Sequence, residues 1–396
     1  MATYYQHVAY LGGLSHALEV FYPIGQTGPL QVTDITKETG TLSVAENMGL
    51  TSWVDGTYEH VVFISGTDVV EAFYPYGQSG LQWSHTDVTS QGAPGVNTGT
   101  ALTSWQDPTY QHFAYIDPNG IVQGASYPIG GVGQRWQITE LGGPVGPYAN
   151  NSLTSWVAGS FQYIGFIVGE FISSSLLVQC YPLGKIGQGG LGSNITDSPG
   201  AYGVSANSPL TSWVDPPVFG NPGAQVYQHV VYVDLNSHLQ EAFSPAGQND
   251  PQWQFTDITK QITGAPGAPS GTPLTSWADS SLQHVVYVGN NQHVIEAYGQ
   301  IGQQEWNFTD ITGQIADQGA PAPGSGSLTS WVAPPYQHVL YIADNYHLID
   351  AYYPVGAKGK QWRFTDITPQ TAQGVHTAVP SSPLTSWVTY SPVVIG

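Results

Sequence analysis

Apolar and polar residues alternate in short runs along the chain, and turn-forming residues separate the runs. Four such runs follow one another at residues 274–278, 283–288, 293–298 and 306–312. They are rich in aromatic and β-branched residues, with a turn at residues 289–291 and a connection rich in Gly, Pro and Ala from Gly319 onward. Short runs bounded by turn residues are typical of antiparallel strands. This stretch therefore predicts four consecutive strands.

The tetrapeptide Leu-Thr-Ser-Trp opens the first of these runs and recurs along the chain. Its seven copies begin at Leu50, Leu102, Leu153, Leu210, Leu274, Leu328 and Leu384. Successive copies lie 51 to 64 residues apart, and similar sequence follows each one until the chain ends. Seven units of four strands predict an all-β fold, a seven-bladed β-propeller made of four-stranded antiparallel blades.

The two ends of the chain complete this pattern. Residues 384–388 form a first strand with no later strands, and residues 5–10 form a second strand with no first. Pairing them closes the ring, whereas the alternative, an open solenoid, leaves unpaired strand edges at both termini. We therefore predict that the C-terminal strand pairs with the N-terminal blade.

The repeat divides residues 1–396 into the blades of a single propeller domain. The predicted boundaries are blade 1, residues 1–49 plus 384–396; blade 2, 50–101; blade 3, 102–152; blade 4, 153–209; blade 5, 210–273; blade 6, 274–327; and blade 7, 328–383. Blade 5 carries an insertion at residues 216–223, which we expect to be an exposed loop.

Charge and composition restrict the partners. The chain has 7 Lys and Arg against 27 Asp and Glu, a net charge of −20. So few cations argue against binding to nucleic acid or to anionic membrane surfaces. The 48 Gly and 29 Pro make long helices improbable. No run of about 18 apolar residues occurs, which predicts no membrane span.

The cysteine count and the N-terminal sequence bear on redox state and location. Cys180 is the single cysteine, which excludes an intrachain disulfide and a Cys-based zinc site. The chain starts without a basic segment followed by an apolar one, so no signal peptide is predicted. We expect a cytoplasmic protein, with release by a non-classical route as the alternative.

Three side chains recur at fixed places in the repeat. The second strand carries a His, the third an acid 11 or 12 residues later, and the fourth opens with a Trp. The candidate ligand-binding residues are His7, Glu19, His60, Glu71, Trp83, His229, Glu241, Trp253, His284, Glu296, Trp306, His338, Asp350 and Trp362. Blade 3 has Gly124 at the place of the acid, and blade 4 has Tyr163 and Val178 at the places of the His and the acid.

These residue types suit sugar binding. A Trp can cover the apolar C–H face of a sugar ring, while a carboxylate accepts hydrogen bonds from two hydroxyls. An imidazole can complete the rim of such a site. Shallow sites bind weakly one at a time, and several sites on one rigid ring gain strength through avidity.

A structural interpretation competes with this one. Propellers of the WD-repeat type hold their strands together with a buried network of His, Asp, Ser or Thr, and Trp. Leu-Thr-Ser-Trp and the repeated Thr-Asp-Ile-Thr could form such a network with the second-strand His, and we interpret both motifs as structural. The Asp residues concerned are Asp34, Asp87, Asp257, Asp310 and Asp366. For the His and acid we favour ligand binding, because blades 3 and 4 keep Leu-Thr-Ser-Trp without the acid.

The repeat resembles that of the fungal fucose-specific lectins. The resemblance rests on Gln-His-Val-Val-Tyr-Val, His-Val-Ile-Glu-Ala-Tyr and the following Trp306, and similar text runs through the whole chain. It implies fucose sites between adjacent blades, in which the third-strand acids match the family's Glu and the fourth-strand Trp residues match its Trp. His stands throughout where that family has Arg, and seven repeats stand where its familiar members have six blades.

We therefore expect a multivalent carbohydrate-binding lectin whose partners are glycans and which needs no cofactor. The alternatives are a propeller-fold glycosidase or polysaccharide lyase with one active site, and a scaffold for protein partners. No catalytic motif is recognisable, and five repeated His–acid pairs argue against one catalytic centre. We expect no metal site, because each second-strand His lies on a different blade.

Several other polar residues stand outside the repeated triplet. Arg135, Arg363, His85 and His376 are expected to be lone surface residues. A second set precedes the third strand in a turn and is expected at the surface: His16, His238, His293 and His347.

Overall fold

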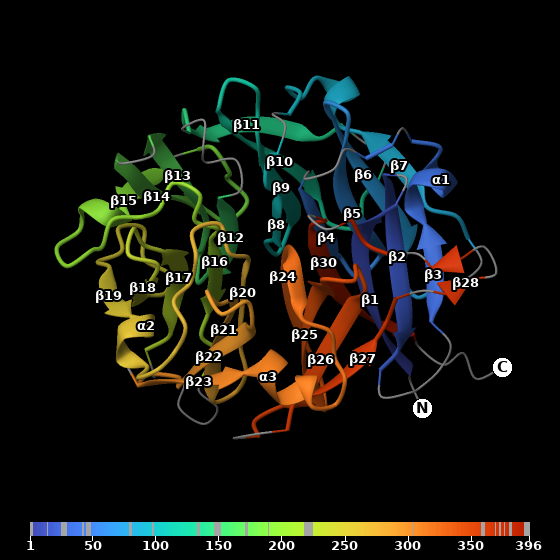
Figure 1. Cartoon of the computed structure of the whole chain (residues 1–396). Helices are drawn as coiled ribbons and strands as arrows, with labels where there is room; N and C mark the ends of the chain where they lie inside the picture. Colours follow the sequence, from blue (N-terminus) through green and yellow to red (C-terminus); the bar gives the residue numbers. More distant parts are fainter. Residues whose placement is uncertain are drawn as a thin grey trace.

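Seven four-stranded antiparallel sheets surround a central axis in the computed structural model (Figure 1), which confirms the predicted seven-bladed β-propeller. The structure describes residues 3–13, 15–24, 30–41, 43–44, 49–78, 81–96, 99–132, 135–145, 152–170, 173–188, 190–217, 225–303, 305–357, 361–368, 370–371, 374–375, 377–379 and 382–391. Two parts named above, residues 218–223 of the insertion and His376, lie outside this set.

The first four blades have these strands, from the axis outward. Blade 1 comprises β30 (Leu384–Ser391), β1 (Thr3–Gly12), β2 (His16–Pro23) and β3 (Gln31–Asp34). Blade 2 comprises β4 (Leu50–Val54), β5 (Tyr58–Ser65), β6 (Asp68–Pro75) and β7 (Ser84–Asp87). Blade 3 comprises β8 (Thr103–Gln106), β9 (Tyr110–Ile116), β10 (Val122–Pro128) and β11 (Gln137–Gly142). Blade 4 comprises β12 (Leu153–Ala158), β13 (Phe161–Glu170), β14 (Ser173–Pro182) and β15 (Leu191–Asn194).

The remaining blades follow the same order. Blade 5 comprises β16 (Thr211–Val214), β17 (Tyr227–Val233), β18 (Leu239–Pro245) and β19 (Gln254–Asp257). Blade 6 comprises β20 (Leu274–Ala278), β21 (Leu282–Val288), β22 (Val294–Gln300) and β23 (Trp306–Asp310). Blade 7 comprises β24 (Pro323–Ala333), β25 (Tyr336–Ala343), β26 (Leu348–Pro354) and β27 (Arg363–Asp366). A small separate sheet pairs β28 (Gln370–Thr371) with β29 (Gly374–Val375).

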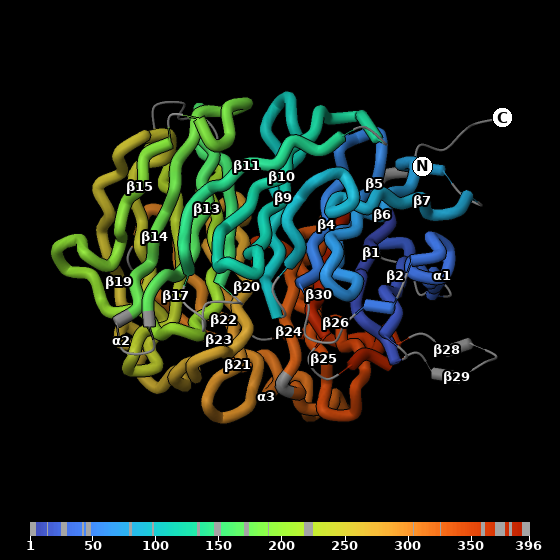
Figure 2. Tube along the Cα trace, turned by 90° about the horizontal axis from the view of Figure 1, so that it is seen from above, coloured from blue at the N-terminus to red at the C-terminus, as the bar shows by residue number. Residues whose placement is uncertain are grey.

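The ring closes through blade 1, which both ends of the chain build. Strand β30 pairs antiparallel with β1, so that Trp387 lies opposite His7 and Leu384 opposite Tyr10. Seen from above (Figure 2), strands β1 and β2 and strand β30 lie together at one part of the ring. The predicted closure is therefore confirmed, and it leaves no open edge at the seam between the first and last strands.

The apolar core lies between neighbouring blades. Each middle strand is buried on both faces because a blade packs on each side; in β17, every residue from Gln228 to Val233 is buried. One apolar cluster joins Ile295 of blade 6 to Val231 of blade 5, and similar clusters join the other neighbours. The burial of both faces explains why the second strands read as nearly continuous apolar runs.

The inner strands form a ring around the axis (Figure 1). The Thr hydroxyl of each Leu-Thr-Ser-Trp lies 2.6 to 3.0 Å from the Ser hydroxyl of the next blade. These pairs are Thr51–Ser104, Thr103–Ser155, Thr154–Ser212, Thr211–Ser276, Thr275–Ser330, Thr329–Ser386 and Thr385–Ser52. The seven pairs close a complete circle. The seven Leu residues line an axial cavity of about 410 Å³ at one end.

The Trp of the same motif forms a second link between blades. In six blades its indole N–H donates to the residue that precedes the second-strand His, or Tyr163, of the next blade. The bonds run from Trp53 to Gln111, Trp105 to Gln162, Trp156 to Gln228, Trp277 to Gln337, Trp331 to Gln6 and Trp387 to Glu59. Leu-Thr-Ser-Trp thus has the structural role that we expected, as the motif that ties each blade to the next.

The Asp of Thr-Asp-Ile-Thr ends the fourth strand rather than joining a network with the second-strand His. In blade 6 the strand stops at Asp310, whose carboxylate accepts the Gly313 N–H and caps α3 (Ile311–Ala316). The strand predicted to reach Thr312 is therefore two residues shorter. Asp34 and Asp257 cap α1 (Ile35–Thr39) and α2 (Ile258–Gln261) similarly, while short 3-10 turns cover Thr89–Gln91 and Ile195–Asp197. Among the described residues, no helix is long and apolar enough to cross a membrane.

Candidate functional site

The second-strand His and the third-strand acid of one blade meet in direct contact. The acid lies opposite the residue two positions beyond the His, as Glu296 lies opposite Val286, so both side chains point to the same face. In the five blades that have both residues, His Nδ1 lies 2.7 to 3.0 Å from the carboxylate. The pairs are His7–Glu19, His60–Glu71, His229–Glu241, His284–Glu296 and His338–Asp350, all buried.

The imidazole of each pair is also held from the axial side. It stacks on the Trp of Leu-Thr-Ser-Trp in its own blade; the ring centres of His284 and Trp277 are 4.6 Å apart. In three of these blades, and also at His112 of blade 3, where Gly124 replaces the acid, a carboxylate two residues beyond that Trp approaches Nε2, at 3.0 to 3.8 Å. These residues are Asp55, Asp107, Asp215 and Asp279. Sequence analysis missed them, although the recurring Trp-x-Asp pattern could have revealed them.

Two carboxylates around one imidazole change the pKa values. Burial alone would lower the pKa of His229, but the carboxylates of Asp215 and Glu241 outweigh it and raise the pKa to about 9. Burial would likewise raise the pKa of Asp55, yet hydrogen bonds from His60 and from the backbone lower it to about 2. His229 is therefore an imidazolium at neutral pH, whose Nδ1 donates to Glu241 while the carboxylate of Asp215 lies 3.2 Å from Nε2.

The Trp that precedes the fourth strand belongs to the neighbouring groove. Trp83 of blade 2 lines a pocket with His7 and Glu19 of blade 1. Trp362 of blade 7 likewise meets His284 and Glu296 of blade 6. A candidate site therefore combines the His–acid pair of one blade with the Trp of the next. Two candidates are not among the residues that line these pockets: Trp253 lies in the apolar cluster that includes Tyr163 of blade 4, and Trp306 lies in the cluster shared by blades 5 and 6.

The largest of these sites is the blade 1–2 pocket, with a volume of about 390 Å³. Its polar lining comprises His7, Glu19, Gln31, Thr33, Glu38, Glu59, Gln78 and Thr389. Its aromatic lining comprises Tyr5, Phe21, Tyr74 and Trp83. The Trp83 backbone N–H donates to Glu38, which anchors the Trp segment against α1. Aromatic walls with convergent carboxylates and amides are typical of small-ligand sites of this volume.

Two other His–acid pairs line smaller spaces. His229 and Glu241 border a pocket of about 140 Å³ between blades 5 and 6, together with Tyr227 and Phe243. His284 and Glu296 border one of about 20 Å³ between blades 6 and 7. The repeat thus gives grooves of the same composition and unequal size.

The remaining grooves are occupied by the protein's own side chains. The Trp136 indole N–H donates to Glu71, and the Tyr22 hydroxyl donates to Asp350, so both acids bind the next blade. In blade 3 a Cβ added at Gly124 would lie 2.5 Å from Leu141 Cδ1 and 3.1 Å from Ile186 Cδ1. Apolar residues therefore fill the place that an acid takes elsewhere.

The turn histidines form a separate set of partly exposed pairs. Nδ1 of His16, His238, His293 and His347 lies 2.6 to 2.9 Å from Asp34, Asp257, Asp310 and Asp366, respectively. Each of these Asp residues thus binds a turn His while its other oxygen holds the backbone beyond the strand. His85, Arg135 and Arg363 are exposed, as expected for surface residues.

Fold and grooves together define a class: a seven-bladed β-propeller with polar and aromatic pockets between adjacent blades. No protein-family model and no curated protein sequence matches the chain. Similarity is found only at the level of solved structures.

Those similar structures include β-propeller lectins. The BP39L lectin of Burkholderia pseudomallei has a TM-score of 0.63 at 13% identity, over 90% of this chain and 94% of that lectin. The six-bladed Aleuria aurantia lectin has a TM-score of 0.51 at 15% identity, over 82% of this chain and 96% of that lectin. It is described as having a novel fucose recognition mode. SapL1 lectin in complex with alpha methyl fucoside has a TM-score of 0.51 at 13% identity, over 85% of this chain and 98% of that lectin. The chain shares their fold, which confirms the predicted resemblance at that level.

Proposed function

We propose that this protein is a carbohydrate-binding lectin whose main site is the blade 1–2 pocket. The observation that carries the proposal is the meeting of a His–acid pair from one blade with Tyr74 and Trp83 from the next. The aromatic rings offer a surface for the apolar face of a sugar, and the carboxylates and amides accept and donate hydrogen bonds at its rim.

An additional, weaker site in the groove between blades 5 and 6 would make the lectin multivalent. The same kind of His–acid pair lines it, in a space of about 140 Å³, whereas the space of about 20 Å³ between blades 6 and 7 has room for about one water molecule. Repetition favours a binding protein over an enzyme, because a catalytic centre needs one asymmetric constellation. Fucosides are the first ligands to test, since SapL1 lectin is in complex with alpha methyl fucoside and the Aleuria aurantia lectin is described as having a novel fucose recognition mode.

A glycan array followed by calorimetric titration tests the proposal. We expect binding to one class of glycan and millimolar or tighter affinity for its terminal monosaccharide. Silence on the array, together with no heat of binding for any monosaccharide at millimolar concentration, would sink the proposal.

Two matched substitutions locate the site. Trp83 and Trp253 are both buried, but only Trp83 lines the blade 1–2 pocket; Trp253 packs against blade 4, which has no His–acid pair. Trp83→Phe should therefore weaken the strongest sugar-binding step, while Trp253→Phe should leave it unchanged. Equal effects of the two substitutions would place the site elsewhere.

A further inference from the structure

One position of the repeat changes only in blade 2. The residue before the second-strand His or Tyr is Gln in six blades: Gln6, Gln111, Gln162, Gln228, Gln283 and Gln337. Blade 2 has Glu59 there, which still accepts the indole N–H of the preceding blade's Trp387, at 2.9 Å. Glu59 thus keeps the structural link and adds a negative charge that the other blades lack.

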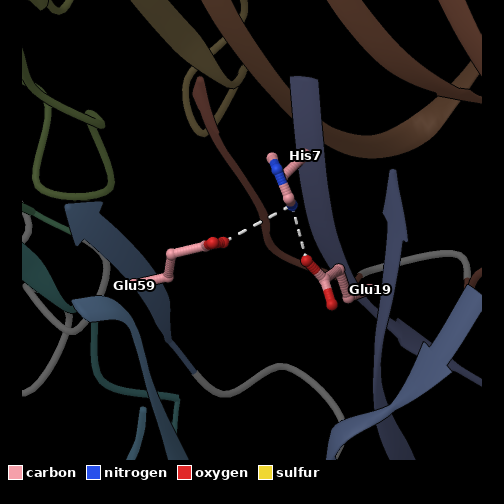
Figure 3. Close-up of side chains that lie close together, drawn as sticks. All are labelled: His7, Glu19 and Glu59. Atoms are coloured by element: carbon pink, nitrogen blue, oxygen red, sulfur yellow. Dashed lines mark hydrogen bonds and ion pairs between the residues drawn. The ribbon is translucent and has the colours of Figure 1, made fainter. Parts of the chain in front are cut away.

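That charge lies against a His that already has an acid partner. Figure 3 shows Glu19 and Glu59 on two sides of His7, at 2.7 and 3.6 Å from the same atom, Nδ1. The other ring nitrogen, Nε2, lies 2.7 Å from the Thr389 hydroxyl. In blade 2, by contrast, Glu71 approaches Nδ1 of His60 and Asp55 approaches Nε2. A single N–H on Nδ1 can form one good hydrogen bond, and it is directed to Glu19. Glu59, at 3.6 Å, therefore receives no hydrogen bond from the imidazole.

The site is buried and lacks a fixed cation. Glu19 and Glu59 are 3% and 4% exposed, and none of the described residues lining the pocket is Lys or Arg. Two carboxylates and a neutral imidazole carry a charge of −2, which one divalent cation would neutralise.

We propose that His7, Glu19 and Glu59 bind a divalent metal ion, with zinc as the ion that best suits the ligands. The three ligand atoms lie within 4.8 Å of one another, the only such group found among the described residues. Small movements would bring them to the distances of about 2.0–2.2 Å that zinc requires from imidazole and carboxylate. The metal takes the place of the proton on Nδ1, and the Nε2 proton is donated to Thr389, which fixes the ring.

The ion would have an open side. Three protein ligands leave the fourth position of a tetrahedral zinc free, and all three ligands line the blade 1–2 pocket. One hydroxyl of a sugar could occupy that position in place of water. This last step rests on the proposed function, whereas the metal site itself does not.

Calorimetric titration of ZnCl₂ into tag-free, EDTA-treated protein, with metal analysis after dialysis, tests the site without any sugar. We expect one zinc per chain. Glu59→Gln installs the residue of the other six blades and can keep the Trp387 hydrogen bond, so it should fold normally and weaken zinc binding at least tenfold. Glu140→Gln removes the same charge from an exposed position and should leave binding unchanged.

Three results would overturn the proposal. They are an absence of zinc binding, unchanged binding in Glu59→Gln, and a stoichiometry near five, which would assign the ion to all five His–acid pairs. Sugar titrations with zinc-loaded and EDTA-treated protein separate the two proposals. Zinc binding without sugar binding would support the metal site and refute the lectin function. Sugar binding by a protein that takes up no zinc would support the lectin function and refute the metal site.

Discussion

The hydroxyl circle around the axis predicts a measurable coupling between neighbouring blades. Thr154 and Ser212 lie 2.6 Å apart, and the Ser212 hydroxyl also lies 3.5 Å from the carbonyl of Ser155. Thr154 is 7% exposed, so water compensates little for a lost partner. A net contribution of about 1 kcal/mol per hydrogen bond gives a loss of about 1 kcal/mol for Thr154→Val and about 1–2 kcal/mol for Ser212→Ala.

A double-mutant cycle measured by urea unfolding, with Trp fluorescence as the signal, tests this reasoning. The double variant should lose about 1 kcal/mol less than the sum of the two single losses, because both substitutions remove the same bond. Thr329→Val, two blades away in blade 7, should combine additively with Ser212→Ala. If the adjacent pair is additive as well, the hydroxyl circle does not hold the blades together.

Three further predictions concern protonation, groove filling and capping. The pKa of His229 rises from 6.5 to about 9 on folding, so its stabilisation, roughly 3 kcal/mol, is present below pH 6.5 and disappears as the pH passes 9. The unfolding free energy of wild type should fall more between pH 6 and 9.5 than that of His229→Asn, and parallel curves would contradict this. Gly124→Glu should lower the melting temperature without creating a site, since Leu141 stands in the way; a stable variant that gains sugar binding would show that the groove can open. Asp310→Ala removes the cap at Gly313 and should cost about 1 kcal/mol in thermal unfolding, and no loss would show that α3 forms without it.

The fold was predictable because each level of the repeat agrees with the others. Seven copies of Leu-Thr-Ser-Trp mark the inner strands, and the terminal runs at residues 5–10 and 384–388 complete one another. The boundary of the fourth strand was less accessible. Thr-Asp-Ile-Thr alternates like a strand, but Asp310 can cap a helix, and the alternation alone does not distinguish the two.

The residue types of the candidate site were predictable, but which residues of neighbouring blades come together in one pocket was not. Spacing links a His to the acid in its own blade, since both lie on adjacent strands. It does not show that Trp83 faces the pair of blade 1, because that contact depends on how neighbouring blades pack. The expectation that there is no metal site considered the histidines alone, whereas the proposed site depends on Glu59, which belongs to the next blade and lies 3.6 Å from His7.

The hydroxyl circle around the axis joins all seven blades, whether or not the groove beside a blade is open. Blade 4 keeps the circle through Thr154 and Ser155 although Tyr163 replaces the second-strand His. Substitutions in the outer half of a blade can therefore close or open one groove while the ring stays whole. The protein offers a scaffold on which valency is an adjustable quantity: a series of rings of identical shape, differing by one groove at a time, would measure avidity with geometry held constant.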